Sequence, residues 1–213
     1  MRKFKNKLTE TIFIIFSALF ISFIIKTFLF QFFLIPSGSM ENTLQIKDRI
    51  MVNRLATYFS EIKRGEVVVF QDPGGWIPKE VTQQNKNIIT NLLQFIGFIP
   101  GDSEQYVIKR AIGVAGDTVT CCVDNMITIN GEKIKEDYIY PGDLPSEENF
   151  SITVPKGYLW VMGDHRSNSA DSRYHRDKND GLVPTSKVTG RALFIIWPLD
   201  RIGILEKTIS KNN

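Results

Sequence analysis

The feature that most constrains this chain is a long, almost uncharged apolar stretch close to its N-terminus. The segment Thr11–Ile25, "TIFIIFSALFISFII", contains no charged residue, and after Lys26 the chain is again uncharged from 27 to 40. About 20 apolar residues, rising about 1.5 Å each in a helix, cross a hydrocarbon core of about 30 Å. We therefore predict a transmembrane helix as an anchor over residues 11–33, with Lys26 near one end, where its side chain can reach the headgroups.

The distribution of charge predicts which side of the membrane each part occupies. Residues 1–40 hold one acidic residue and five basic ones, which are Arg2, Lys3, Lys5, Lys7 and Lys26. By difference from the 26 basic and 23 acidic residues of the whole chain, residues 41–213 carry 21 and 22, a net charge of −1. The positive-inside rule then places residues 1–10 in the cytoplasm and residues 34–213 on the outer face of the cell membrane. A nucleic-acid partner is not expected, because the basic excess does not lie in the folded part.

A cleaved signal peptide is the alternative interpretation of the N-terminus. Small residues follow the apolar run in "LIPSGSMENTL", residues 34–44, as they do at a cleavage site. However, the apolar core of a signal peptide is about 7–15 residues long, and nothing like A-x-A is present here. This segment is therefore either a cleavage site of the chain itself or part of a catalytic site that cleaves other chains.

The remainder of the chain predicts an antiparallel β domain. Seven stretches are rich in β-branched and aromatic residues and are bounded by turn residues: 49–55, 65–71, 105–114, 117–123, 126–134, 152–163 and 190–199. Asn130-Gly131 predicts a hairpin, since both central residues of a type I′ turn need positive φ. Residues 73–105 form an irregular insert. Its apolar middle, Asn87–Ile99, is interpreted either as a helix packed on the core or as an element resting on the membrane surface.

The two cysteines, Cys121 and Cys122, are adjacent. A bridge between neighbours departs from ordinary disulfide geometry, so two half-buried strand thiols are expected. The sequence contains no metal-ligand spacing and no glycine-rich phosphate loop, so we expect no metal, no nucleotide and no other cofactor.

Catalytic chemistry is suggested by Ser37-Gly38-Ser39, which combines hydroxyls and backbone N–H groups with a residue that allows a sharp bend. A serine hydroxyl needs a base to act as a nucleophile. Lys109 can serve as that base if burial in its apolar strand makes the amine neutral near pH 7. A histidine can do the same work, and His165 and His175 lie in or beside the polar stretch 163–173, "GDHRSNSADSR". The residues alone leave both bases open.

Four stretches in this order, 36–44, 48–54, 106–119 and 163–173, together with the N-terminal span, resemble the conserved boxes of bacterial type I signal peptidases. The resemblance covers nearly all of the chain after the anchor, and "GLVPTSKVTGRALFIIWP" resembles the closing strands of that family. It implies a membrane-bound serine endopeptidase that cleaves signal peptides from exported preproteins after small residues at positions −3 and −1. The expected partners are therefore signal peptides and the lipid bilayer.

The resemblance also implies roles for individual residues. Ser39 would be the nucleophile and Lys109 the general base, while Ser37 would donate to the oxyanion and Ser169 would orient the lysine amine. The structural residues of the site would be Arg110, Asp171 and Arg173. The shallow apolar substrate pockets would be formed by Phe33, Ile35, Met40, Leu44 and Ile108.

Three residues depart from the family pattern. Asn42 and Ala115 each replace a proline, which affects backbone stiffness rather than chemistry, and His165 stands where an asparagine is common. Two other functions stay open at this point. One is a catalytically silent membrane-tethered β domain that binds exported proteins, although such a domain would be expected to lose Ser39 or Lys109. The other is a serine hydrolase that uses a histidine base.

Overall fold

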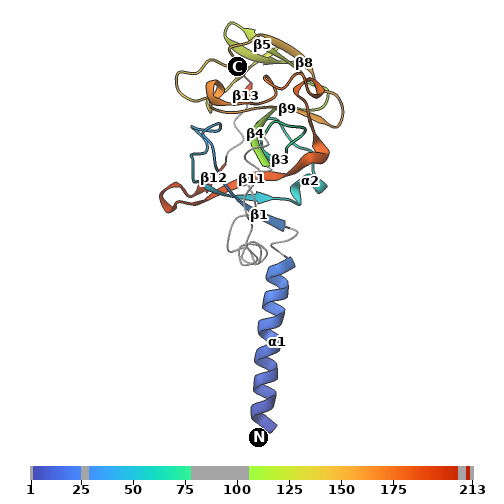
Figure 1. The fold of residues 1–213 in the computed structure, drawn as a ribbon, viewed down its shortest axis with the longest axis vertical. Helices are drawn as coiled ribbons and strands as arrows, with labels where there is room; N and C mark the ends of the chain where they lie inside the picture. The colour runs from blue at the N-terminus through green and yellow to red at the C-terminus, as the bar shows by residue number, and fades with distance from the viewer. Residues whose placement is uncertain (1, 25–28, 78–105, 206–209, 212–213) are drawn as a thin grey trace.

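The computed structural model describes residues 2–24, 29–77, 106–205 and 210–211. A long helix, α1 (Arg2–Ile24), extends away from a domain made of antiparallel strands (Figure 1). The larger sheet contains β1 (Phe30–Leu34), β2 (Arg49–Asn53), β3 (Val67–Gln71), β4 (Tyr106–Gly113), β9 (Tyr158–Met162), β10 (Val183–Pro184), β11 (Val188–Trp197) and β12 (Gly203–Ile204). The smaller sheet contains β5 (Thr118–Val123), β6 (Met126–Ile129), β7 (Glu132–Lys135), β8 (Phe150–Thr153) and β13 (Ser210–Lys211). Short helical segments lie at Ala56–Phe59 (α2), Arg166–Asn168, Asn179–Gly181, Thr185–Lys187 and Leu199–Arg201.

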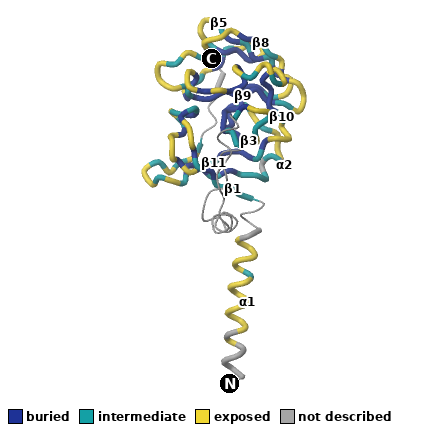
Figure 2. The backbone as a smooth tube through the Cα atoms, viewed as in Figure 1, coloured by how far each residue is buried: buried dark blue, intermediate teal, exposed yellow. Residues whose placement is uncertain are grey.

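Helix α1 is 23 residues long, and its large apolar residues between 12 and 21 are exposed (Figure 2). In the ranges that the structure describes, no helix combines the length and the apolarity that crossing a membrane requires. The end of the expected span, residues 30–33, belongs instead to β1, which pairs antiparallel with β2. Phe33 is fully buried in the domain, so these apolar residues stabilise the sheet. A helix from 11 to 33 is therefore wrong in its C-terminal boundary.

The larger sheet has the strand order β1-β2-β11-β3-β4-β9-β10, with β12 paired to β11. Its central strand β3 reads Val-Val-Val-Phe and is covered on both faces, as expected of a continuous apolar strand. One face packs in a cluster that we call the Phe33 core, which comprises Phe33, Ile35, Met40, Leu44, Ile50, Val52, Val67, Val69, Ile108, Ala192 and Ile195. The other face packs in the Trp76 core, which comprises Val68, Phe70, Trp76, Leu159, Val161, Val183 and Val188.

The smaller sheet has the order β13-β7-β6-β5-β8 and lies at the end of the domain away from α1 (Figure 1). Asn130 and Gly131 connect β6 to β7 with φ values of 55° and 82°, which confirms the predicted hairpin. Trp160 and Phe150 pack at the centre of its core. The antiparallel β domain expected from the sequence is thus confirmed.

Two other expectations concerned the adjacent cysteines and the 73–105 insert. Cys121 and Cys122 are joined by a disulfide, so two free strand thiols are wrong. The peptide bond between them is cis, and their Cα atoms are 3.0 Å apart. The two interpretations of Asn87–Ile99 lie outside the described residues, as does most of the 73–105 insert.

Candidate active site

The segment 36–44 is a tight loop that follows β1 and is fixed at both ends. The Ile35 N–H donates to the Asp48 carbonyl at 2.9 Å, and the Leu44 N–H donates to the Met40 carbonyl at 2.7 Å. Met40 and Leu44 are buried in the Phe33 core. These contacts leave Ser39 half-buried at the wall of a cleft.

Asn42, one of the departures from the family pattern, explains how this loop holds its shape without proline. It adopts φ 84°, a conformation that asparagine tolerates better than most residues. Its side-chain amide donates to the carbonyls of Tyr138 and Ile139 at 3.2 and 3.1 Å. Another departure, Ala115, is exposed in the turn between β4 and β5 and does not line this cleft.

Lys109 lies on β4 with its amine in hydrogen-bonding contact with Ser39. The Nζ–Oγ distance is 2.7 Å, and the lysine residue is only 4% exposed. Burial lowers the pKa of Lys109 to about 8, although the carboxylates of Asp171 and Asp164 act in the opposite direction. A serine beside an amine that loses its proton near pH 8 is an arrangement that can activate a hydroxyl for attack.

Ser37 lies on the same side of the loop as the Ser39 hydroxyl. The two Oγ atoms are 3.5 Å apart, and Ser37 is exposed where it lines the cleft. A hydroxyl at this distance can turn its proton toward a charge that develops next to Ser39.

Ser169 lines the same cleft but has a different hydrogen bond from the one expected. Its hydroxyl donates to the Asp171 carboxylate at 2.8 Å, and within the described residues no hydrogen bond joins it to Lys109. Burial raises the pKa of Asp171, but hydrogen bonding and the charge of Arg173 outweigh it and keep that pKa below its ordinary value. Asp171 therefore stays ionised and fixes the direction of the Ser169 proton, which leaves the oxygen lone pairs of Ser169 for a second donor.

Gly163 permits the close approach of these groups. A Cβ atom at this position would collide with the Ser169 hydroxyl and with the Ser39 carbonyl oxygen. The Gly163 N–H also donates to Asp171 at 2.9 Å. The loop 163–173 can therefore lie against the nucleophile only because residue 163 lacks a side chain.

Arg110 has a buried partner that the sequence analysis did not name. Its guanidinium binds both oxygens of Asp164, at 2.9 and 2.6 Å, rather than Asp171. Thr43 donates to the same carboxylate at 2.5 Å. The Arg110–Asp164 pair thus joins β4 to the nucleophile loop and to the loop 163–173. In the sequence, the only indication of this ion pair was the presence of Asp164 as the first acidic residue of "GDHRSNSADSR".

The cleft beside Ser39 has a volume of about 710 Å³. Four of the five expected pocket residues line it, namely Phe33, Ile35, Met40 and Ile108. Leu44 does not line it, because this side chain is fully buried behind Met40 in the Phe33 core. The sequence analysis missed Trp76, Ile77, Tyr106, Val107 and Tyr174, which also line the cleft.

Neither histidine is bonded to the serine. The Nδ1 atom of His165 pairs with the Glu41 carboxylate at 2.9 Å, and the ring stacks on Tyr140. The Nδ1 atom of His175 lies 2.9 Å from the Asp171 carbonyl oxygen, and this ring stacks on Trp76. The geometry therefore favours Lys109 over a histidine as the base. In the parts of the chain that the structure describes, no three His, Cys, Asp or Glu side chains are grouped as metal ligands.

Comparisons with known proteins indicate the family to which this chain belongs. The family described as "Signal peptidase, peptidase S26" matches residues 8–197. A probable signal peptidase I of Mycobacterium leprae is 39% identical, with 85% of this chain and 73% of the relative covered. Signal peptidase I of Mycobacterium tuberculosis is 37% identical over 88% of this chain and 72% of the relative, and signal peptidase I P of Bacillus subtilis subsp. natto is 30% identical over 93% and 94%. A crystal structure of a signal peptidase I from Enterococcus faecalis matches with 25% identity and a TM-score of 0.40, covering 62% of this chain and 97% of that one.

Proposed function

This chain belongs to the signal peptidase family, peptidase S26, as an enzyme of the type I class, and from that membership we propose that Ser39 and Lys109 form the catalytic dyad that releases exported preproteins from their signal peptides. The observation that carries the proposal is the 2.7 Å contact between the Ser39 hydroxyl and the buried amine of Lys109. The lowered pKa of Lys109, about 8, supports it, since a base must be neutral before it can accept a proton.

The reaction follows from these positions. As the Ser39 oxygen attacks the carbonyl carbon of the −1 residue, its proton passes to the neutral amine of Lys109. The ammonium then gives a proton to the leaving nitrogen, so that the mature chain departs as an amine and an acyl-enzyme remains. Water attacks the ester in the second half of the reaction, with the same amine accepting its proton. The ammonium returns this proton to the Ser39 oxygen as the ester bond breaks, so the signal peptide leaves as a carboxylic acid and both Ser39 and the neutral amine are regenerated.

Two serines support the dyad in this proposal. The negative oxygen of the tetrahedral intermediate is stabilised by the Ser39 N–H and the Ser37 hydroxyl. In this proposal the Ser169 oxygen, whose own proton is directed at Asp171, accepts a hydrogen bond from the ammonium of Lys109 once that ammonium forms during the reaction, a contact that is absent from the described part of the structure. Ser169 therefore positions the lysine without taking a proton itself.

Small residues at −1 and −3 are expected of a type I signal peptidase, and the apolar wall beside Ser39 is the proposed site that receives them. Ile35, Met40 and Ile108 line this wall and are each less than 9% exposed, so each presents only a small surface to the cleft. Aliphatic and thioether walls also give no partner to a polar side chain. The expected substrate is therefore an extended peptide with alanine-sized residues at both positions.

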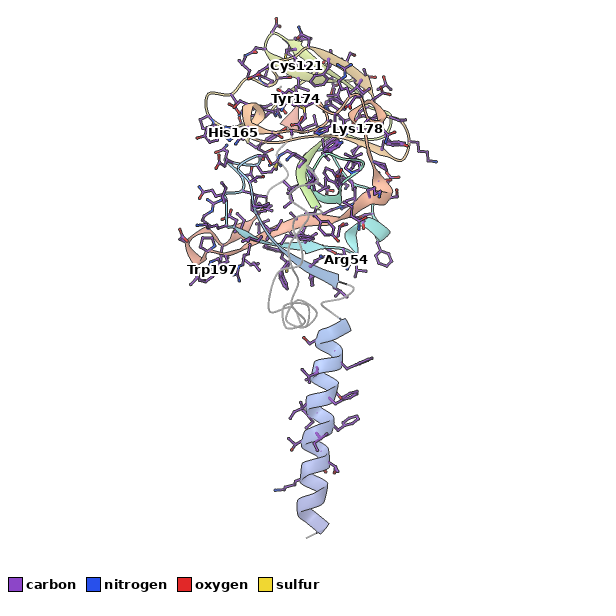
Figure 3. All side chains as sticks on the ribbon, viewed as in Figure 1. Arg54, Cys121, His165, Tyr174, Lys178 and Trp197 are labelled. Carbon is purple, nitrogen blue, oxygen red and sulfur yellow. A yellow bond between two sulfur atoms is a disulfide. The ribbon has the colours of Figure 1, made fainter. Side chains whose placement is uncertain are left out.

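We further propose that α1 anchors the enzyme in the cell membrane, with residues 1–10 in the cytoplasm and the β domain outside. In α1, Phe13, Phe16 and Leu19 are 66–70% exposed, which is unfavourable in water and favourable in lipid. Trp197, which is 48% exposed, lies at the end of the β domain that faces α1 (Figure 3). Aromatic side chains at that level suit a membrane–water interface.

The test of the dyad uses full-length protein purified in detergent and a preprotein with alanine at −1 and −3. Wild type should release a mature chain whose N-terminus is the residue after the −1 alanine, while Ser39→Ala should release none. Ser186→Ala is the matched control, since this exposed serine does not line the cleft and its loss should leave the rate unchanged. Cleavage by Ser39→Ala at the wild-type rate would refute the assignment.

The test of the orientation is protease digestion of intact spheroplasts. The β domain should be digested while a cytoplasmic marker protein survives. Complete protection of the β domain would contradict the proposed topology.

A further inference from the structure

Strand β4 has one edge that is paired throughout its N-terminal half and another edge that is not. The first edge pairs with β3, from Val67↔Arg110 to Gln71↔Tyr106. On the other side β9 pairs only with the C-terminal half of β4, beginning at Arg110↔Met162. Within the described residues, no strand pairs with Tyr106–Lys109 on this second side. An extended peptide could add there as a short strand.

The backbone groups that would receive such a peptide can be identified from the pairing. The Ala111 N–H donates to the Glu66 carbonyl on the β3 side. Because successive residues of a strand direct their N–H and C=O groups to alternate sides, Lys109 and Val107 also bond toward β3. The N–H and C=O groups of Ile108 and Tyr106 then point to the open edge.

The cleft extends over both faces of the sheet at this edge. Ile108 belongs to the Phe33 core, and Tyr106 packs on that core with its ring 5.0 Å from Phe33. Val107, on the opposite face of β4, packs on the Trp76 core. Residues of both faces line the one cleft that contains Ser39 and Lys109.

The wall on the second face is rigid and apolar. Trp76 stacks on His175 with ring centres 4.4 Å apart and meets Phe70 edge-on at 5.7 Å. The Asp72 carboxylate accepts the N–H groups of Gly74, Gly75 and Trp76 at 2.8–2.9 Å, which fixes the loop that carries Trp76 and Ile77. The ammonium of Lys178 donates to the Gly75 carbonyl at 2.8 Å.

Tyr174 completes this second wall. It is 43% exposed and lines the cleft, with the Arg173 guanidinium 5.2 Å from the centre of its ring. Tyr174 and Lys178 lie in the half of the domain away from α1 (Figure 3). The contact with Arg173, which is itself held by Asp171, limits the movement of the tyrosine ring.

We propose that Trp76, Ile77, Val107 and Tyr174 form a subsite that selects an apolar side chain at position −2 of the substrate. The inference rests on the proposed function, which places the −1 carbonyl at Ser39. Side chains of an extended peptide alternate between the two faces, so the −2 side chain points away from the −1 and −3 pocket and toward this wall. Specificity is therefore two-sided, with small residues on one face and a larger apolar residue on the other.

The experiment compares peptides that differ only at −2, with alanine kept at −1 and −3. Leucine and asparagine are nearly equal in shape, so the pair isolates the effect of apolarity. For wild-type protein, kcat/KM should be roughly tenfold higher with leucine, because part of the side chain leaves water against an apolar wall. In Tyr174→Ala and Ile77→Ala the ratio should fall to about twofold, while the rate on the asparagine peptide changes little.

Phe59→Ala is the matched control, because this aromatic residue is 81% exposed and lies outside the cleft. It should keep the wild-type ratio. Equal processing of both peptides by wild type would refute the subsite while leaving the Ser39–Lys109 dyad in place. Equal loss of rate on both peptides in Tyr174→Ala would also refute it. Failure of wild type to cleave either peptide would instead refute the proposed function.

Discussion

Raising the pH from 6 to 8 should increase kcat/KM on a signal-peptide substrate about 50-fold, because only the neutral form of Lys109 can accept the Ser39 proton. The pKa of Lys109 is lowered from 10.5 to about 8 by burial. With that pKa, the neutral fraction is about 1% at pH 6, about 9% at pH 7 and about half at pH 8. At pH 7 this is about 300-fold more neutral amine than an unperturbed lysine would provide.

The shape of the profile distinguishes the buried base from an ordinary amine. Above pH 8 the rate should level off, rising only about twofold more by pH 9.5. A lysine with its ordinary pKa would give a further increase of about 30-fold over the same interval. The assay is the initial rate of cleavage of one fluorogenic peptide, at concentrations far below KM, from pH 6 to 9.5.

Lys109→Arg separates a base from a fixed positive charge. Arginine keeps the charge but does not lose its proton in a protein. The variant should lose about 10²–10⁴-fold in kcat/KM, as expected when a general base is removed, and its ascending limb should disappear. Lys156→Arg, at an exposed position outside the cleft, is the control and should keep the wild-type profile. An arginine variant that retained a tenth of the rate, or an ascending limb abolished by His165→Ala, would refute the reasoning.

Four further outcomes are expected. The Lys109→Met variant should be more stable than wild type at pH 7 by about 3 kcal/mol, because the folded-state pKa of about 8 lies below the unfolded value of 10.5. Since the unfolded chain binds the extra proton between those values, wild-type stability rises with pH there, and the difference should shrink by about 2 kcal/mol between pH 7 and 9.5 in denaturant titrations. Gly163→Ala should abolish cleavage, whereas Gly203→Ala, where a methyl group meets no atom closer than 3.9 Å, should not; an active Gly163→Ala would contradict the close approach of the two loops. A preprotein with phenylalanine at −1 should be cleaved at least about 100-fold more slowly than one with alanine, and equal processing would rule out the shallow pocket. His165→Ala and His175→Ala should each keep most of the activity in the same assay, and loss of activity in either would reopen the histidine hypothesis.

The strands were predictable because their signals are local. Alternating β-branched residues and the Asn130-Gly131 turn identify strands and a hairpin without knowledge of the fold. Ser39 and Lys109 were found through the resemblance, and the apolar neighbours of Lys109 already indicated burial. Their 2.7 Å contact, across 70 residues of sequence, depends on the packing of β4 against the loop after β1.

The parts that the sequence did not predict depend on tertiary contacts or on ambiguous patterns. An apolar strand and the end of a membrane span have the same composition, so β1 was included in the anchor. The pairing of Arg110 with Asp164, rather than Asp171, is decided by which carboxylate the fold brings to β4. Leu44 was assigned to a pocket, although an apolar residue near a cleft can equally be core behind it. Trp76 and Tyr174 gave no signal because they reach the cleft from separate loops.

The four-residue open edge of β4 also has a consequence for turnover. In the proposed binding mode, the residues that pair with Tyr106–Lys109 all belong to the signal peptide, so hydrolysis itself would remove none of those contacts. The product therefore competes with the next preprotein, and its departure can limit kcat. A longer open edge would retain the product more tightly and would also expose more backbone for pairing between copies of the enzyme. Because the pairing of β9 with β4 begins at Arg110, the open edge is limited to four residues, which limits the backbone contacts that could retain a product.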